Sequence, residues 1–136
     1  MELMRPETLP TALQTSCQRL SLVPDQRLFR QGDRAKAVYI LSEGRLRCCR
    51  STAERQLMTL AVANTSQILG EEALFSDRYL TSAIADTPTQ LLAYPIQALE
   101  SAIAQFPELG AHLITLIGQK VQRLQTLLEL RSNRSA

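Results

Sequence analysis

The chain has 136 residues, of which 45% are hydrophobic and 21% are charged. This length suits one domain, and this composition suits a packed core rather than an intrinsically disordered chain. A formal net charge of only +2 gives no general indication of nucleic-acid binding.

The cysteines and the apolar runs indicate the compartment. Cys17, Cys48 and Cys49 are an odd set with no CxxC spacing, and a bridge between neighbouring strand residues would be strained. We therefore expect three reduced thiols and no iron–sulfur cluster, which ordinarily needs four cysteine ligands. The chain has no apolar signal-peptide core and no apolar run long enough to span a membrane. These features predict a cytoplasmic protein with no membrane association.

An N-terminal helical segment is predicted over residues 1–24. Pro6-Glu7-Thr8 is typical of a helix start, and apolar residues recur from Leu9 to Leu22 over about three turns. Val23-Pro24-Asp25 is expected to end this helix.

A barrel of short strands is predicted over residues 25–94. Apolar or alternating runs are separated by turns such as Gly32-Asp33 and Ser42-Glu43-Gly44. Strands at a spacing of roughly ten residues indicate a sandwich or a barrel. The predicted strands begin near Leu28 and then cover Ala37 to Leu41, Arg45 to Thr52, Gln56 to Ala63, Ser82 to Ala85 and Gln90 to Ala93.

Helices are predicted over residues 95–131. Pro95 suits a first helical position, Phe106-Pro107 breaks the first helix, and a longer helix runs from Glu108 to about Arg131. We expect residues 132–136 to be a tail or the start of a linker.

The long helix carries an apolar seam of the coiled-coil type, with alternating steps of three and four residues. We expect this seam to join two copies of the chain as a parallel homodimer. The alternative is a helix that is buried only against its own domain. The predicted seam consists of Ile114, Ile117, Val121, Leu124 and Leu128.

The stretch Ile68–Ala83 is the strongest candidate for a binding site. Gly70-Glu71 leads into a short apolar turn, Ala73-Leu74-Phe75, and Thr81-Ser82-Ala83 opens the next strand. A glycine beside a short helical turn with exposed amides is a common way to build an anion cradle. The pattern therefore predicts a pocket that binds an anion.

In their order and spacing these segments resemble the cyclic-nucleotide-binding-domain superfamily, and within it the sensor domain of Crp/Fnr transcription regulators. The resemblance covers roughly residues 10–131. It implies a mainly β fold with flanking helices: an eight-stranded jelly-roll barrel, a phosphate-binding cassette and a long C-terminal dimerisation helix. The segments that carry it are Leu28–Asp33, Val38–Gly44, Leu69–Phe75, Ser82-Ala83 and Pro107-Glu108-Leu109.

The cassette departs from that of the relatives that bind cyclic AMP. In those proteins an arginine that neutralises the cyclic phosphate stands before Ser-Ala, whereas this chain has Thr81. The Thr-Ser pair that they offer to the adenine falls here at about Leu127-Leu128. The resemblance therefore implies that cyclic AMP is not the effector.

Arg78, with Tyr79 beside it, is similar to a loop arginine of the 2-oxoglutarate-sensing nitrogen regulators of this superfamily, which binds a carboxylate. Their dimer helix also supplies an Arg and a Glu, at positions that match Gln122 and Leu127. Arg123 lies one residue away and is expected to point about 100° round the helix. The alternative is a surface Arg78 paired with Asp77 or Glu72.

The predicted function is effector sensing and dimerisation in a Crp/Fnr-family transcriptional regulator, with DNA bound only through a helix-turn-helix domain that these residues do not contain. The alternative is a stand-alone module that binds a small anion or a protein. We expect no enzymatic activity, no metal and no cofactor, but a small anionic effector such as 2-oxoglutarate or a cyclic nucleotide. The predicted effector-binding residues are Gly70, Glu71, Ala73, Leu74, Arg78, Tyr79, Thr81, Ser82, Ala83, Arg123 and Leu127.

Overall fold

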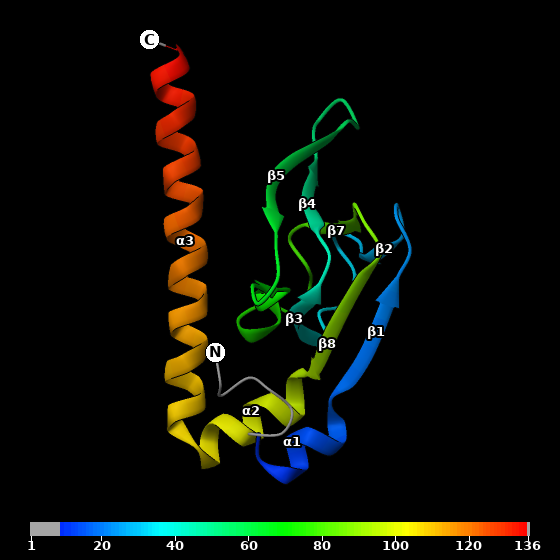
Figure 1. Cartoon of the computed structure of the whole chain (residues 1–136), viewed down its shortest axis with the longest axis vertical. Coiled ribbons are helices and arrows are strands. Elements are labelled where there is room, and N and C mark those ends of the chain that lie inside the picture. Colours follow the sequence, from blue (N-terminus) through cyan, green and yellow to red (C-terminus); the bar gives the residue numbers. More distant parts are fainter. Residues whose placement is uncertain (1–8, 136) are drawn as a thin grey trace.

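The computed structural model describes the backbone of residues 9–135 and the side chains of residues 9–132. Two four-stranded antiparallel sheets form a barrel, and a long helix stands beside it (Figure 1). The predicted mainly β fold with flanking helices is confirmed. The first sheet consists of β1 (Gln18–Leu22), β8 (Thr89–Pro95), β3 (Ala37–Glu43) and β6 (Ile68–Leu69), in that order. The second sheet consists of β2 (Arg27–Phe29), β7 (Ser82–Ala85), β4 (Leu46–Ser51) and β5 (Leu57–Ala63).

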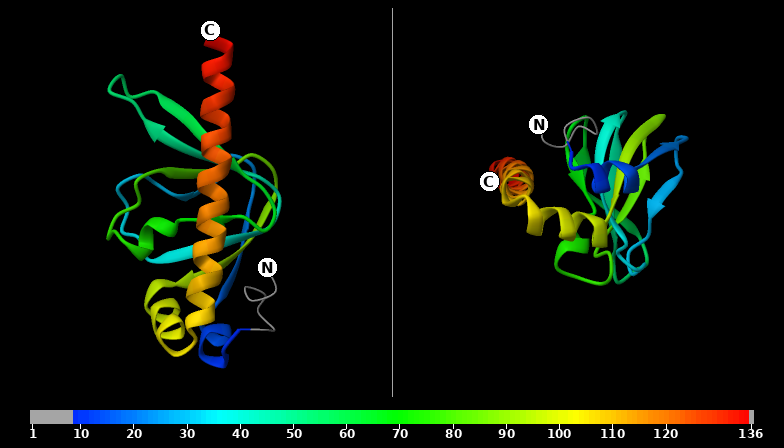
Figure 2. Two further views of the ribbon diagram at one scale, coloured as in Figure 1. Left: turned by 90° about the vertical axis from the view of Figure 1, so that its left-hand side faces the viewer. Right: turned by 90° about the horizontal axis from the view of Figure 1, so that it is seen from below.

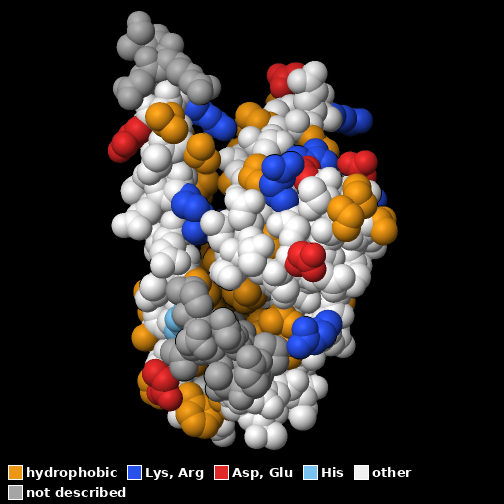
Figure 3. Space-filling view, viewed as in Figure 1, with side chains coloured by type: hydrophobic (Ala, Val, Ile, Leu, Met, Phe, Trp, Pro, Cys, Tyr) orange, Lys and Arg blue, Asp and Glu red, His pale blue; other side chains and the backbone are white. Residues whose placement is uncertain are grey.

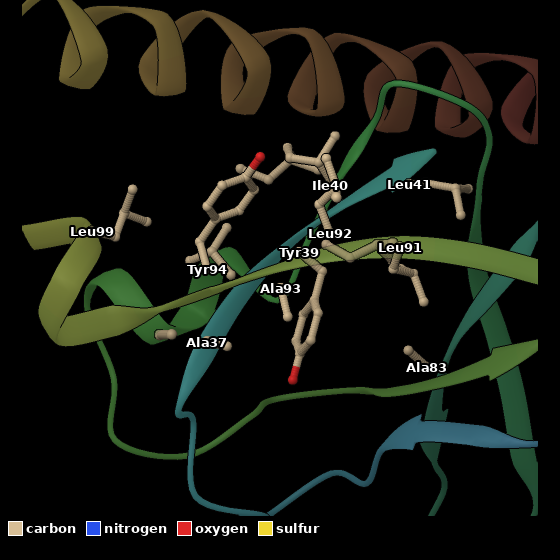
Figure 4. Close-up of a cluster of buried hydrophobic side chains, with 14 of the residues drawn as sticks. Ala37, Tyr39, Ile40, Leu41, Ala83, Leu91, Leu92, Ala93, Tyr94 and Leu99 are labelled. Carbon is tan, nitrogen blue, oxygen red and sulfur yellow. The ribbon is translucent and has the colours of Figure 1, made fainter. Parts of the chain in front are cut away.

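The centre of the first sheet is buried on both faces. Strands β3 and β8 pair in antiparallel register, with Tyr39 opposite Ala93 and Ile40 opposite Leu92. Ile40, Leu92 and Tyr94 point toward the long helix, whereas Tyr39 and Ala93 point into the barrel (Figure 4). Strands covered on both faces are continuously apolar rather than alternating, which explains the unbroken apolar run in β3.

The N-terminal helix is shorter than predicted. Helix α1 spans only Thr11–Ser16, and Gln18–Leu22 is strand β1, which pairs antiparallel with β8. The prediction of a helix as far as Leu22 is therefore wrong, and in the described part of the predicted segment only Thr11–Ser16 is helical. The reason is that Leu20 and Leu22 alternate with Arg19 and Ser21, a period of two that suits an edge strand. The predicted helix start at Pro6-Glu7-Thr8 lies outside the described residues.

The two C-terminal helices follow the prediction, with different ends. Helix α2 spans Ile96–Gln105, and Pro95 is the residue before it rather than its first residue. Helix α3 begins at Pro107 and continues to Ser135, so the predicted tail at residues 132–136 is helical as far as the structure describes it. No helix in the described part of the chain has the length and apolarity to cross a membrane.

Helix α3 presents two apolar rows to different surroundings. Leu109, Leu113 and Leu116 are buried against the rest of the fold. Two further views place α3 alongside the barrel (Figure 2). The predicted seam is only partly free of the domain. Ile114, Val121 and Leu128 are exposed, whereas Ile117 packs against the core and Leu124 lines the space between α3 and the barrel. Burial against its own domain therefore accounts for one row of this helix and for part of the seam.

Candidate functional site

A large hollow lies between α3 and strands β4 and β5. It is a cavity of about 790 Å³. Apolar side chains gather along the line where α3 meets the barrel (Figure 3). The barrel wall includes Leu60, Val62 and Ile68, and the helix wall includes Leu124 and Leu127. The cavity is thus a cleft with apolar walls between the barrel and the helix.

The charges on the cavity are of one sign. Lys120, Arg123 and Arg131 line it, and no Asp or Glu is found among the described lining residues. Arg123 is half-buried and has no hydrogen-bond or ion-pair partner among the side chains that the structure describes. A half-buried, unpartnered guanidinium in an apolar cleft is a strong attractor for an anion.

Lys120 forms an ion pair with a carboxylate of the predicted cassette, Ile68–Ala83. Its Nζ donates to both carboxylate oxygens of Glu71 at 2.8 Å. The two side chains are only 18% and 14% exposed, so the ion pair is largely shielded from water. This contact ties α3 to η3 (Glu71–Leu74), the short helical turn that also holds Ala73 and Leu74.

Gly70 turns the chain into η3, as the glycine signal predicted. Its φ is 69°, in the left-handed region that favours glycine. A Cβ here would lie 3.0 Å from the ring of Tyr39 and 3.2 Å from the ring of Tyr79. The position therefore needs glycine both for its backbone conformation and for the close approach of two aromatic rings.

Thr81 is engaged within the cassette itself. The carboxylate of buried Glu72 accepts hydrogen bonds from Thr81 Oγ1 and from the Leu80 backbone N–H, both at 3.3 Å. Ser82 Oγ accepts a bond from the Gln31 backbone N–H at 2.9 Å. Ala83 is buried in the ladder beside Cys48. The hydroxyl groups of Thr81 and Ser82 are thus both engaged in hydrogen bonds within the fold.

Arg78 and Tyr79 lie away from the cavity, although both were predicted to share a pocket with Arg123. The Arg78 guanidinium donates to the carbonyl of Gly32 at 3.4 Å. The Tyr79 hydroxyl donates to the Ala37 carbonyl at 2.6 Å, and its ring stacks on Phe29 with centroids 3.9 Å apart. Burial raises the pKa of this hydroxyl, which keeps it a proton donor. Tyr79 is a core residue that anchors the loop.

Of the predicted effector-binding residues, the structure brings Arg123 and Leu127 to the cavity. Gln122 and Arg123 are neighbours on α3, about 100° apart round the helix, and both line the cavity. Lys120 was missed. A signal for it existed, since Lys120, Arg123 and Leu127 continue the steps of three and four that begin at the buried leucines of α3.

Cys48 also lines the cavity, and its thiol is buried beside the ion pair. All three cysteines are free, as predicted. Burial is the main cause that raises the Cys48 pKa to about 11, and Lys120 lowers it by a smaller amount. The thiol is therefore neutral and a poor nucleophile at neutral pH.

The raised pKa of Cys48 predicts a loss of stability in alkali. An unfolded chain releases this proton near the ordinary pKa of 9.0, whereas the folded chain holds it until about 11. The contribution is fully present below pH 9 and is lost as the pH rises through 11, by at most about 2.7 kcal/mol. Urea unfolding at pH 8 and pH 11 should show a smaller drop for Cys48→Ala than for the unchanged chain. Equal drops in both proteins would contradict the assignment.

A profile of one known family matches most of the strands and helix α2. The cyclic nucleotide-binding domain profile matches residues 19–106, which include every strand from β2 to β8 and most of β1. The chain belongs to the cyclic nucleotide-binding domain family. Its predicted resemblance to this family is thereby confirmed.

Individual relatives agree with the family assignment. The chain is 28% identical over 111 residues to the global nitrogen regulator of Nostoc sp., covering 79% of this chain and 49% of that protein. It is 28% identical over 130 residues to the cyclic AMP receptor protein of Thermus thermophilus, covering 95% of this chain and 60% of that protein. The crystal structure of the sensor domain of the transcriptional regulator DNR from Pseudomonas aeruginosa superposes with a TM-score of 0.70 at 27% identity, covering 84% of this chain and 78% of that one. The chain thus spans about half the length of the nitrogen regulators that it matches.

Proposed function

We propose that the chain is the effector-sensing and dimerisation domain of a Crp/Fnr-family transcriptional regulator in the cytoplasm, and that its effector is an organic anion bound in the cavity. The observation that carries the proposal is Arg123, an unpartnered guanidinium on a cavity that no described carboxylate lines. The domain binds its ligand and does not convert it. Because the cavity lies between barrel and helix, its occupant contacts both and can bias the position of α3.

Cyclic AMP is a poor match to this site. Thr81, in place of a phosphate-binding arginine, bonds to Glu72. Glu71, which would receive a ribose hydroxyl in cyclic-AMP-binding relatives, is held by Lys120. Leu127 offers no hydrogen bond to a base. A cyclic nucleotide would have to break an ion pair and would meet no cation at its phosphate, a loss of about 1.5–3 kcal/mol or more.

The exposed residues of the α3 seam support the dimer. We propose that Ile114, Val121 and Leu128, which are all exposed in the single chain, pack against the same row of a second copy. DNA binding would then belong to a helix-turn-helix domain elsewhere in a longer protein, positioned by the paired helices.

Thermal unfolding tests the effector site. The chain should be scanned with cyclic AMP, cyclic GMP, 2-oxoglutarate and a set of monocarboxylates. A ligand at a hundredfold its dissociation constant stabilises the native state by about 2.7 kcal/mol, which is several degrees for a domain of this size. We expect an organic acid rather than cyclic AMP to give this shift, and we expect Arg123→Gln to abolish it.

The matched control is Arg78→Gln, which removes an arginine of the cassette loop that lies outside the cavity and should leave the shift unchanged. A shift with cyclic AMP that survives Arg123→Gln would overturn the proposed site. No shift with any anion would favour a ligand-independent dimerisation module.

A further inference from the structure

The cavity is larger than a small metabolite needs. At about 790 Å³ it lies in the range of about 300–1,000 Å³ in which pockets enclose drug-sized ligands. A five-carbon dicarboxylate has only about ten non-hydrogen atoms and would leave most of this space to water. The occupant that fills the cavity must have a body considerably larger than its anionic group.

The walls that such a body would touch are apolar on both sides. Leu60, Val62 and Ile68 come from the barrel, and Leu124 and Leu127 come from α3. Val62 is 41% exposed and Leu127 is 38% exposed. Removing such surfaces from water is favourable in proportion to the apolar area that is covered. Contact with both walls therefore stabilises the binding of an apolar ligand body.

The polar end of the cavity suits a single negative charge. Lys120 is already neutralised by Glu71, and Arg131 lies two turns beyond Arg123, about 12 Å along the helix. Of the three cations that line the cavity, Arg123 is the one that has no partner among the described residues. A dicarboxylate needs two cations close together, whereas a monocarboxylate needs one fork of guanidinium N–H groups.

From the size, the walls and the charge, we propose that the cavity binds an amphipathic monoanion: a carboxylate on Arg123 with an apolar chain of about eight to twelve carbons lying between the barrel and α3. This inference rests on the proposed effector site and names the chemical class of its ligand. Medium-chain alkanoates are the simplest members of that class.

A series of linear carboxylates tests the proposal on the unchanged chain. Butyrate, hexanoate, octanoate and decanoate should be titrated by calorimetry below their micelle-forming concentrations, together with 2-oxoglutarate and neutral decanol. We expect affinity to rise about fourfold for each added methylene until the cavity is filled, since each contributes about 0.8 kcal/mol. We expect Arg123→Gln to weaken decanoate at least tenfold and to leave decanol unchanged.

Two further variants locate the ligand. Leu127→Gln should flatten the dependence on chain length, because it makes one apolar wall polar, and Arg78→Gln should change nothing. Melting temperatures without ligand show whether each variant is folded. Equal binding of decanol and decanoate would overturn the anionic head group. Binding of 2-oxoglutarate through Arg123 without binding of decanoate would overturn this inference and leave the proposed function standing. Failure of every anion to bind would overturn both.

Discussion

Val121→Glu is expected to convert the proposed dimer into monomers. Val121 is 47% exposed in the single chain and lies at the centre of the seam, seven residues from both Ile114 and Leu128. In a parallel pair each seam residue meets its own copy, so the substitution places two carboxylates against each other in an apolar interface. Burial of an unpaired charge costs several kcal/mol, which corresponds to a dimer dissociation constant raised by at least about a hundredfold. Sedimentation equilibrium measures this change directly.

The control for this variant is Thr115→Glu. Thr115 is exposed on the same helix but belongs neither to the seam nor to the cavity. It adds the same charge to α3 and should leave the dimer intact. Both variants should keep the secondary structure of the unchanged chain, because neither side chain is buried in the core. A Val121→Glu protein that sediments as a dimer would refute the assignment of the seam.

The predictable part of the fold is the part that rests on local patterns. Apolar runs bounded by turn residues located β3, β4, β5, β7 and β8 to within about two residues at each end, which is the usual uncertainty of element ends. Strand β6 escaped because Ile68–Leu69 is too short to show a period and exists by pairing with β3. Strand β1 was taken for helix although residues 19–22 alternate with a period of two, and its partner, β8, lies some 70 residues away in the chain. Tertiary pairing decided β6, and it confirms a weak local signal in β1.

The candidate site also has a part that local residue patterns predict and a part that only the folded chain shows. The turn at Gly70 and the apolar faces of α3 follow from residue types and spacing alone. The partner of Glu71 does not, because Lys120 lies 49 residues away and only the folded chain brings the two together. The place of Arg78 does not follow from local pattern either. Its guanidinium donates to the carbonyl of Gly32, which is 46 residues away, and it lies outside the cavity that Arg123 lines.

Lys120→Met is expected to destabilise the fold by about 3 kcal/mol, because it leaves Glu71 largely buried without its cation. The double variant Glu71→Met with Lys120→Met should recover most of this loss, since well-packed apolar side chains of similar size commonly replace a buried ion pair at little cost. Urea unfolding of the four proteins in a double-mutant cycle gives the coupling between the two side chains. The control is Arg45→Met, which removes an exposed partner of Asp86 and should cost no more than about 1 kcal/mol.

The ion pair between Lys120 and Glu71 also affects how a bound ligand can act on α3. The ion pair joins η3, in the cassette, to α3, which carries the seam, so it is a direct connection between the binding region and the proposed dimer interface. A ligand that competes for Glu71 has to release Lys120, whereas a ligand held by Arg123 leaves the pair intact. We therefore expect the stable double variant to keep the Arg123-dependent thermal shift. Loss of that shift in a protein of near-normal stability would show that the ion pair, and not Arg123 alone, holds the ligand.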